Sequence, residues 1–339
     1  MKFHLKNKDG NIIINQFTLE CKSCIKSTTL KSNKVICSIH KDKRIIGFYE
    51  NEIGSCFACS NDELLYNKPK IFRKKVQFAN DSMYAVENIK KELKEGAERL
   101  THNLTKTNAH NIQELYALVP QDILSKNYKN QLEIISEIIM EDPIEAAKTF
   151  LRIAKNNAAI KVEFSVFNKM FSGNSSLNIK PYHIKNVTLN VFHIFFNNFN
   201  KINVYVDVQD CEDTIRIDYE SIHVILYHLI DNATKYILPD TTLYVTFVKN
   251  ENDYRIRLDM ISVKIEEEEK TKILSDRVRG VYAKKLNKTG SGIGLSQISK
   301  ILDVIGGDLI IYNNPNEEKS VKYKSVKFEN NIFEIILNN

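Results

Sequence analysis

The sequence has no long hydrophobic run. None of the apolar segments in its 339 residues is long enough to cross a bilayer, and the first ten residues, MKFHLKNKDG, lack the apolar stretch of a signal peptide. Internal repeats and low-complexity tracts are absent as well. We therefore expect a cytoplasmic protein without a membrane partner.

A large excess of either charge is also missing. The 48 basic and 42 acidic residues give a net charge of +6, which is modest for this length and does not by itself indicate nucleic acid. A hydrophobic content of 43% with 27% charged residues excludes wholesale disorder. We expect an α+β chain in three parts, which cover residues 1–75, 76–172 and 173–339.

Cysteine is scarce outside one short region. Five of the six cysteines fall between residues 21 and 59, where short β-rich runs predict a small β domain. In a reducing compartment such a cluster favours metal ligation over disulfides. Two Cys-x-x-Cys pairs on tight turns would suit tetrahedral zinc, and the predicted ligands are Cys21, Cys24, Cys56 and Cys59.

Other interpretations of the cysteine region stay open. Cys37 and His40 lie between the two pairs, so the choice of four ligands is not settled. A redox or iron–sulfur sensor and unligated thiols are the alternatives to zinc. A nucleic-acid-binding zinc ribbon is a further possibility, but acidic residues follow the local lysines, so we do not expect nucleic acid as a partner.

From about residue 76 the pattern becomes helical. The first helix should end near Val119, because Pro120 disfavours helical geometry in the residue before it. A second helical region follows over residues 131–171, with a break at Asp142, before Pro143. Apolar spacings of three, four and seven indicate a bundle seam through Val86, Leu93, Ala97, Leu100, Leu104 and Thr107. Two helices cannot bury both faces alone, so we expect a homodimeric four-helix bundle.

His102 is a candidate reactive group on the first helix. It lies two residues from both Leu100 and Leu104, so the seam turns its imidazole outward, where another domain can reach it. The alternative is an ordinary solvated histidine. His110, which is also followed by asparagine, is the second candidate.

The last part alternates strands with amphipathic helices, which predicts a mixed sheet with helices on one face. On one of these helices Asn232 and Lys235 share a face with His228. An amide oxygen can bind Mg²⁺ and an ammonium group can neutralise phosphate oxygens. Asp259 ends a later strand, where a buried carboxylate could accept the amine proton of adenine.

Three alternating glycines, Gly290, Gly292 and Gly294, run directly into an apolar-periodic helix. Backbone N–H groups at a helix start favour an anion such as phosphate, although glycines there can also be turn residues alone. A dinucleotide-binding fingerprint would need a further glycine where Leu295 stands, so a Rossmann turn is not indicated.

Three motifs of this sequence resemble those of sensor histidine kinases in their order and spacing. The N box resembles LYHLIDNATKY, the G1 position resembles Asp259, and the G2 box resembles GSGIGL…IGGDLIIY. Sensor histidine kinases belong to the ATPases with a Bergerat-type nucleotide fold. The resemblance covers roughly residues 180–339, and RLTHNLTKTNAHN resembles the phosphoacceptor box. It implies ATP and Mg²⁺ as cofactors. In this resemblance Asn232 would bind Mg²⁺, Lys235 would contact the phosphates, and His228 would transfer a proton or contact a phosphate. Tyr236 would form a wall of the nucleotide pocket, and Asp259 would recognise adenine. Gly290, Gly292 and Gly294 would form a lid over the nucleotide, and His102 would accept the phosphoryl group.

Two departures from the family pattern stand out. Ile261 and Val263 replace glycines that follow the aspartate in the family, and Asn103 stands where many members carry an acid that accepts the imidazole proton. The resemblance implies a homodimeric protein-histidine kinase that passes its phosphoryl group to an aspartate of a separate response regulator in two-component signalling. An ATPase or serine kinase of the same nucleotide fold, and an ATP-binding pseudokinase or scaffold, are the alternatives.

Overall fold

The computed structural model describes residues 1–21, 25, 32–126, 129–171, 177–286, 290, 292–315 and 320–338. It divides into two compact units, Met1–Glu98 and Arg99–Asn339, and the boundary lies within the long helix α4 (Met83–Leu118). Among the described helices, none combines the length and the apolar character needed to cross a membrane.

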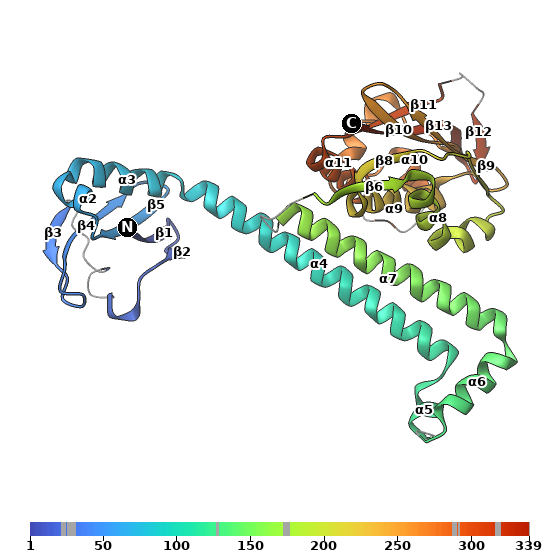
Figure 1. The fold of residues 1–339 in the computed structure, drawn as a ribbon, viewed down its shortest axis with the longest axis horizontal. Helices are drawn as coiled ribbons and strands as arrows, with labels where there is room; N and C mark the ends of the chain where they lie inside the picture. The colour runs from blue at the N-terminus through green and yellow to red at the C-terminus, as the bar shows by residue number, and fades with distance from the viewer. Residues whose placement is uncertain are drawn as a thin grey trace. The chain divides into compact units, whose positions relative to one another are not determined.

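The first unit is built on an antiparallel sheet of five strands in the order β2-β1-β5-β4-β3 (Figure 1). The strands are β1 (Lys2–Asn7), β2 (Ile12–Asn15), β3 (Asn33–Ile36), β4 (Lys43–Glu50) and β5 (Gly54–Ser60), with a 3₁₀ turn at Leu19–Cys21. Helices α2 (Glu63–Asn67) and α3 (Pro69–Asp81) follow. The ring of Phe72 packs so close to Gly47 of β4 that a Cβ there would stand 2.7 Å from it, so this contact requires glycine.

The structure corrects the expected zinc knuckles. Cys56 and Cys59 lie within β5, and residues three apart on a strand point to opposite faces of the sheet. Cys56 belongs to the same core as Phe72, where burial raises the pKa of its thiol to about 12. The Cys59 thiol instead lies 3.9 Å from the Arg44 guanidinium. The two thiols therefore do not form the paired turn that one tetrahedral ion needs.

The other expected zinc ligands do not form a metal site within the part of the chain that the structure describes. Cys21 is buried at the end of the 3₁₀ turn, and Cys24 lies outside the described residues. Cys37 Sγ accepts a hydrogen bond from the backbone N–H of His40. Among the described residues, no three His, Cys, Asp or Glu side chains are grouped in a way that could hold a metal ion.

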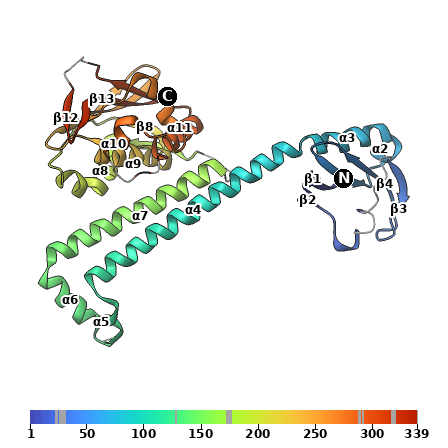
Figure 2. The same cartoon turned by 180° about the vertical axis from the view of Figure 1, so that it is seen from behind.

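The second unit begins with a helical hairpin. After Glu98, α4 runs beside α7 (Pro143–Phe171) in both views, and α5 (Gln121–Lys126) and α6 (Gln131–Glu141) connect them (Figures 1 and 2). The predicted helix end before Pro120 and the break at Asp142 are confirmed. Polar contacts join the two long helices: Asn111 donates to Asn157 at 2.9 Å, and Arg152 to Glu114 at 2.6 Å.

The remainder of this unit is the predicted mixed sheet with helices on one face. The sheet order is β11-β13-β10-β9-β7, β12 pairs with β13, and only β7 runs parallel to its neighbour among the described strands. Helices α8 (Ile184–Asn200), α9 (Tyr219–Tyr236) and α11 (Gly294–Ile305) bury their apolar faces against it. The strands are β7 (Tyr205–Val208), β9 (Thr242–Lys249), β10 (Asp253–Val263), β11 (Asp308–Asn313), β12 (Val321–Tyr323) and β13 (Val326–Asn338).

Shorter elements complete the fold. Strands β6 (Ile179–His183) and β8 (Thr214–Asp218) form a separate antiparallel pair. The 3₁₀ turns Glu267–Glu269 and Lys272–Leu274 and helix α10 (Val281–Lys285) lie between β10 and the glycine segment. Helix α7 also packs against α8, α9 and α11, so the hairpin lies against the helical layer of the sheet domain.

Candidate functional site

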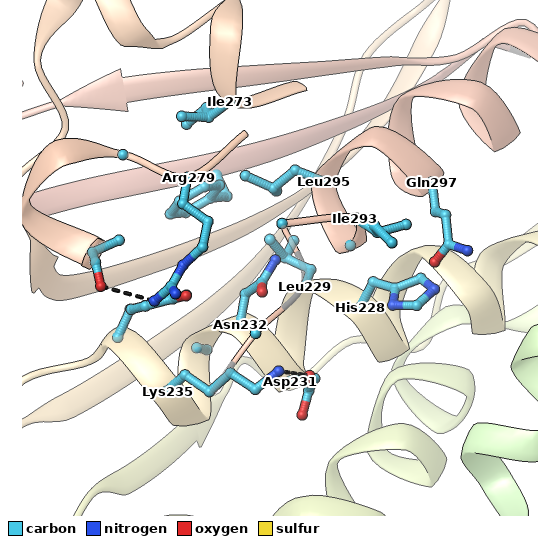
Figure 3. Close-up of a pocket in the computed structure, with 18 of the residues that line it drawn as sticks. His228, Leu229, Asp231, Asn232, Lys235, Ile273, Arg279, Ile293, Leu295 and Gln297 are labelled. Carbon is cyan, nitrogen blue, oxygen red and sulfur yellow. Dashed lines mark hydrogen bonds and ion pairs between the residues drawn. The ribbon is translucent and has the colours of Figure 1, made fainter. Parts of the chain in front are cut away.

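One pocket of about 300 Å³ lies between α9, the glycine segment and β10 (Figure 3). Its size is at the lower end of the range for ligand sites. Its walls come from α9, from the residues leading into α11, and from the end of β10, with Asn103, Ala159 and Glu163 of the hairpin at one edge. Apolar and charged groups both face this space, as expected for a site that holds an amphipathic ligand.

Helix α9 supplies the charged wall of the pocket. Asp218 caps the helix by accepting from the Ser221 backbone N–H at 2.9 Å. Four predicted residues then face the pocket from its last turns: His228, Asn232, Lys235 and Tyr236. Lys235 pairs with Asp231 one turn earlier (Figure 3), which holds its ammonium group at the pocket wall.

The three predicted glycines also line the pocket, and a side chain would be crowded at Gly292. A Cβ on Gly290 would stand 3.5 Å from the Tyr236 hydroxyl, and one on Gly294 would stand 3.4 Å from the Asn232 amide. Gly292 has a φ of +70°, in the left-handed region that favours glycine, and a Cβ there would lie 2.8 Å from the Val278 carbonyl. Gly292 thus fits a backbone position that other residues rarely adopt, and the glycine segment lines the pocket.

Asp259 is not part of the pocket, and the expected role for it is wrong. Side chains alternate along β10, and Leu258 and Met260 face the helices while Asp259 faces the other side of the sheet. The Asp259 carboxylate accepts from Asn330 at 2.5 Å. Met260 lines the pocket instead, so a carboxylate that reads an exocyclic amine is absent from this wall of β10.

A signal for this arrangement was present in the sequence. Along β10 the apolar residues Tyr254, Ile256, Leu258 and Met260 alternate with charged ones. Period-two alternation places every second residue on the polar face, and Asp259 belongs to the polar set. Reading the strand by its alternation would have placed Met260 in the pocket.

The hairpin side of the pocket was also not foreseen. Asn103 and Glu163 line it, and their side chains are hydrogen-bonded to each other. Burial raises the pKa of Glu163, although Asn103 and Arg99 oppose the shift. His102 is exposed on α4 and is not among the lining residues, and His110 is exposed too. The structure therefore brings the neighbour of His102, and not His102 itself, to the pocket.

Two further polar residues complete the wall near α11. His228 is half-buried, and burial lowers the pKa of its imidazole to about 4, partly opposed by Asp231. Gln297 is 2% exposed and lines the same wall. Arg279, at another edge, donates to the Ala283 carbonyl at 3.0 Å. The sequence motifs did not single out Arg279 or Gln297.

The comparison with protein families identifies this part of the chain. The model for histidine kinase-, DNA gyrase B- and HSP90-like ATPases matches residues 217–330, which include α9, β10 and the glycine segment. Residues 217–330 form a histidine kinase-like ATPase domain. Membership in this family implies ATP binding, and the matched range contains nearly every residue of the pocket.

A curated relative points to the same family. Residues of this chain are 30% identical over 118 positions to the adaptive-response sensory kinase SasA of the organism Prochlorococcus marinus. The match covers 34% of this chain and 30% of SasA, so this chain spans less than a third of that kinase. The histidine kinase-like ATPase domain is thus distantly related to sensor histidine kinases.

The solved structures to which this chain is similar include three histidine kinases. The mycobacterial sensor kinase MprB is 14% identical, with a TM-score of 0.39 and coverage of 47% of this chain and 97% of its own. The catalytic domain of ThkA is 19% identical, with a TM-score of 0.37 and coverage of 48% of this chain and 97% of its own. AdeS of Acinetobacter baumannii is 16% identical, with a TM-score of 0.36 and coverage of 71% of this chain and 96% of its own. Scores this low do not define a common arrangement of the whole chains.

Proposed function

We propose that the protein is a histidine kinase that phosphorylates His102 from ATP and passes the phosphoryl group to an aspartate of a response regulator. The observation that carries the proposal is the pocket itself. It unites Asn232, Lys235 and the three glycines on an ATPase domain, and a helical hairpin with an exposed histidine borders it. An ATPase without phosphotransfer to histidine would have no need of this hairpin.

The phosphate end of the pocket fits a metal–triphosphate group. The Lys235 ammonium group and the glycine backbone face one end, where a side chain on Gly294 would fill the space beside Asn232. An amide oxygen is a suitable ligand for a divalent cation, and glycines let backbone N–H groups reach phosphate oxygens. These residues therefore fit a nucleotide with its Mg²⁺.

The part of the pocket that would hold the nucleotide base has fewer groups that could distinguish one base from another. Its wall includes Met260, Ile273, Val278 and Phe333, which provide an apolar slot for a flat ring. The two carboxylates that line the pocket within the described residues, Asp231 and Glu163, are held by Lys235 and Asn103 respectively. Base recognition thus rests on shape and apolar contact in the described part of the pocket.

In the proposed mechanism the nucleotide, when bound with its cation, supplies the phosphoryl group. Asn232 would hold the cation, and Lys235 would offset the negative charge that develops on the transferring group. A neutral nitrogen of His102 would attack the γ-phosphorus as the bond from that phosphorus to the departing ADP oxygen breaks, and the proton on the other ring nitrogen must then leave. Asn103 cannot take that proton. Glu163, bonded to Asn103 at the pocket edge, is the carboxylate on the hairpin side that we propose for this role.

His102 must still reach a pocket. Because its side chain is exposed on α4 and does not line the adjacent pocket, the reaction needs either movement of the ATPase domain along the hairpin or the pocket of a second copy. We propose a homodimer, in which the two hairpins form a four-helix bundle. The response regulator would then bind from outside the dimer.

A second candidate is an ATP-binding scaffold that regulates a partner without phosphotransfer. Two observations favour it: Met260 and not the Asp259 carboxylate lines the pocket, and the residue after His102 is Asn103, whose amide cannot accept the imidazole proton. Such a protein would bind nucleotide to change conformation but would not label any histidine.

Labelling with γ-labelled ATP separates the two candidates. Purified wild type, His102→Ala, His110→Ala and Asn232→Ala are incubated with Mg²⁺ and the nucleotide, and the label is tested for acid lability. The kinase predicts acid-labile label that is lost in His102→Ala and Asn232→Ala but kept in His110→Ala. Nucleotide binding with no label in any variant, even with candidate regulators present, would exclude the kinase and support the scaffold.

A further inference from the structure

Helix α3 of the first unit turns one side to the sheet and leaves the opposite side uncovered. Phe72, Val76 and Asn80 are buried, and the helix packs on β4, β5 and α2. These three residues are spaced four apart, so they form one stripe along the helix. No other described element of the first unit covers the opposite side of α3 (Figures 1 and 2). The side chains on that side are therefore accessible to a partner.

Large apolar side chains stand on the uncovered side. Phe78 is 74% exposed and Ile71 is 38% exposed, and the two lie seven residues apart, which is about two helical turns. Leu64 of the preceding helix α2 is 54% exposed. Phenylalanine is among the residues that folding most often buries, so a ring this exposed, on the same side as an exposed isoleucine, indicates contact with a partner.

The uncovered side of α3 is also basic. It carries or borders four exposed basic residues: Lys70, Arg73, Lys74 and Lys75. Within the described part of the chain, none of the four belongs to an ion pair. The acidic residues of the two helices lie at their ends, with Glu63 at the start of α2 and Asp81 at the end of α3, where its carboxylate accepts from Asn51 at 2.9 Å. The middle of the surface therefore has a net positive charge.

We propose that this surface binds an anionic lipid bilayer; we call it the α3 face, and it consists of Lys70, Ile71, Arg73, Lys74, Lys75 and Phe78. An amphipathic surface of this kind places basic side chains among the lipid phosphates and apolar side chains at the boundary with the acyl chains. A cluster of four or more basic residues on a helix is typical of surfaces that bind acidic headgroups. Such a contact needs no spanning helix, so the short apolar runs of the sequence do not bear on it.

The composition of the α3 face favours lipid over two other partners. Two copies packed face to face would bring their basic side chains together, and like charges across an interface are costly. Nucleic acid would neutralise the lysines, but phosphate contacts make no use of exposed Phe78 and Ile71. The headgroup region of an anionic bilayer offers both phosphates and apolar chains, so it matches both kinds of side chain on this face.

Co-sedimentation of the full chain with vesicles measures the binding. Vesicles of equal parts phosphatidylcholine and phosphatidylserine are compared with vesicles of phosphatidylcholine alone. Wild type should bind only the anionic vesicles, and high salt should weaken the binding. Lys74→Gln/Lys75→Gln should weaken it about twenty-five-fold, since each basic residue near an anionic surface contributes about fivefold. Phe78→Gln should weaken it about tenfold, because the ring no longer enters the apolar boundary.

Two control variants match these changes outside the α3 face. Lys91→Gln/Lys94→Gln removes the same charge from α4, where the two lysines pair with Glu95 and Glu98 at 4.0 and 3.8 Å. Ile12→Gln removes an exposed apolar side chain from β2. Both controls should bind anionic vesicles as wild type does. All the substituted side chains are exposed, so every variant should show the thermal melt of wild type.

Four results would overturn the proposal. Wild type that does not bind the anionic vesicles would exclude it. Equal losses in Lys74→Gln/Lys75→Gln and in the lysine control would show that overall charge, and not the α3 face, attracts the vesicles. Tighter binding to a double-stranded DNA fragment, unchanged in Phe78→Gln, would assign the face to nucleic acid. Association of copies without lipid that Phe78→Gln abolishes would assign it to a second copy of this chain.

Discussion

Lys169 Nζ lies 2.9 Å from Asp218 Oδ2, in an ion pair between side chains that are only 9% and 3% exposed. Lys169 is in the last turn of α7, and Asp218 caps α9, the helix that carries Asn232. The same carboxylate accepts from the backbone N–H groups of Asn178 and Ser221. One buried group thus ties the hairpin, the following strand and the nucleotide-site helix together.

Removing the cation of this pair should destabilise the second unit strongly. Lys169→Met leaves a buried carboxylate without its counter-charge, and such changes cost about 3–5 kcal/mol of unfolding free energy. Urea denaturation followed by circular dichroism measures the change. Lys180→Met, at an exposed lysine on β6, should alter the unfolding free energy by less than about 0.5 kcal/mol. Similar midpoints for the two variants would refute this role of the pair.

The same pair predicts a pH dependence of stability. Burial alone would raise the pKa of Asp218, but the bonds from Lys169 and Ser221 outweigh it and hold the pKa below the ordinary 3.8. A carboxyl whose pKa is lower in the folded state stabilises it above the unfolded pKa, and this contribution is lost as the pH falls through the folded value. The difference in unfolding free energy between wild type and Lys169→Met should therefore be constant near neutral pH and shrink below about pH 4. A difference that grows in acid would contradict this assignment.

Base selectivity should be weak, because Met260 and not Asp259 faces the pocket. We expect the dissociation constants of ATP and GTP to differ by less than about threefold, whereas a charged hydrogen bond to the exocyclic amine would separate them roughly tenfold or more. Calorimetric titration of both nucleotides measures the ratio. Asp259→Asn should leave the ratio of the two dissociation constants unchanged. A loss of ATP affinity in that variant would show that Asp259 does bind the nucleotide.

Gly294→Ala should separate stability from binding. The new methyl group would stand 3.4 Å from the Asn232 amide and fill the cation space, so nucleotide affinity should fall about tenfold or more. Because Gly294 begins α11 without a left-handed φ, alanine should raise the unfolding free energy by about 0.4–1 kcal/mol. Thermal melts and calorimetry measure the two effects. Ser299→Ala, on the same helix but outside the pocket, should keep wild-type affinity.

The hairpin should mediate dimerisation. In a single copy Leu115 and Ile112 of α4 and Phe150 and Leu151 of α7 are 44–57% exposed, an unusual amount of apolar surface for paired helices. Light scattering should show a dimer that Leu115→Glu converts to a monomer, because a buried charge in the bundle is costly. Glu141→Gln, at an exposed residue of α6, should remain dimeric. A monomeric wild type at high concentration would exclude the bundle.

Local chemistry was enough to predict much of this molecule from its sequence. Pro120 and Pro143 restrict the backbone beside them, so the helix boundaries at Leu118 and Asp142 follow from neighbours alone. The grouping of Asn232 and Lys235 follows from the helical repeat. Glycines before an amphipathic helix likewise predict a ligand-facing backbone without knowledge of the rest of the chain.

Only the tertiary structure decided which face of the sheet and which distant partner each side chain meets. The pairing of β10 with β9 and β13 turns Met260 inward and Asp259 outward, and the strand around Cys56 and Cys59 separates the two thiols. The hydrogen bond of Asn103 with Glu163 joins residues far apart in the chain, and so does the pocket wall that His228 and Gln297 share. Backbone propensity acts over a few residues, whereas these juxtapositions arise from strand register and helix packing, which the whole domain determines.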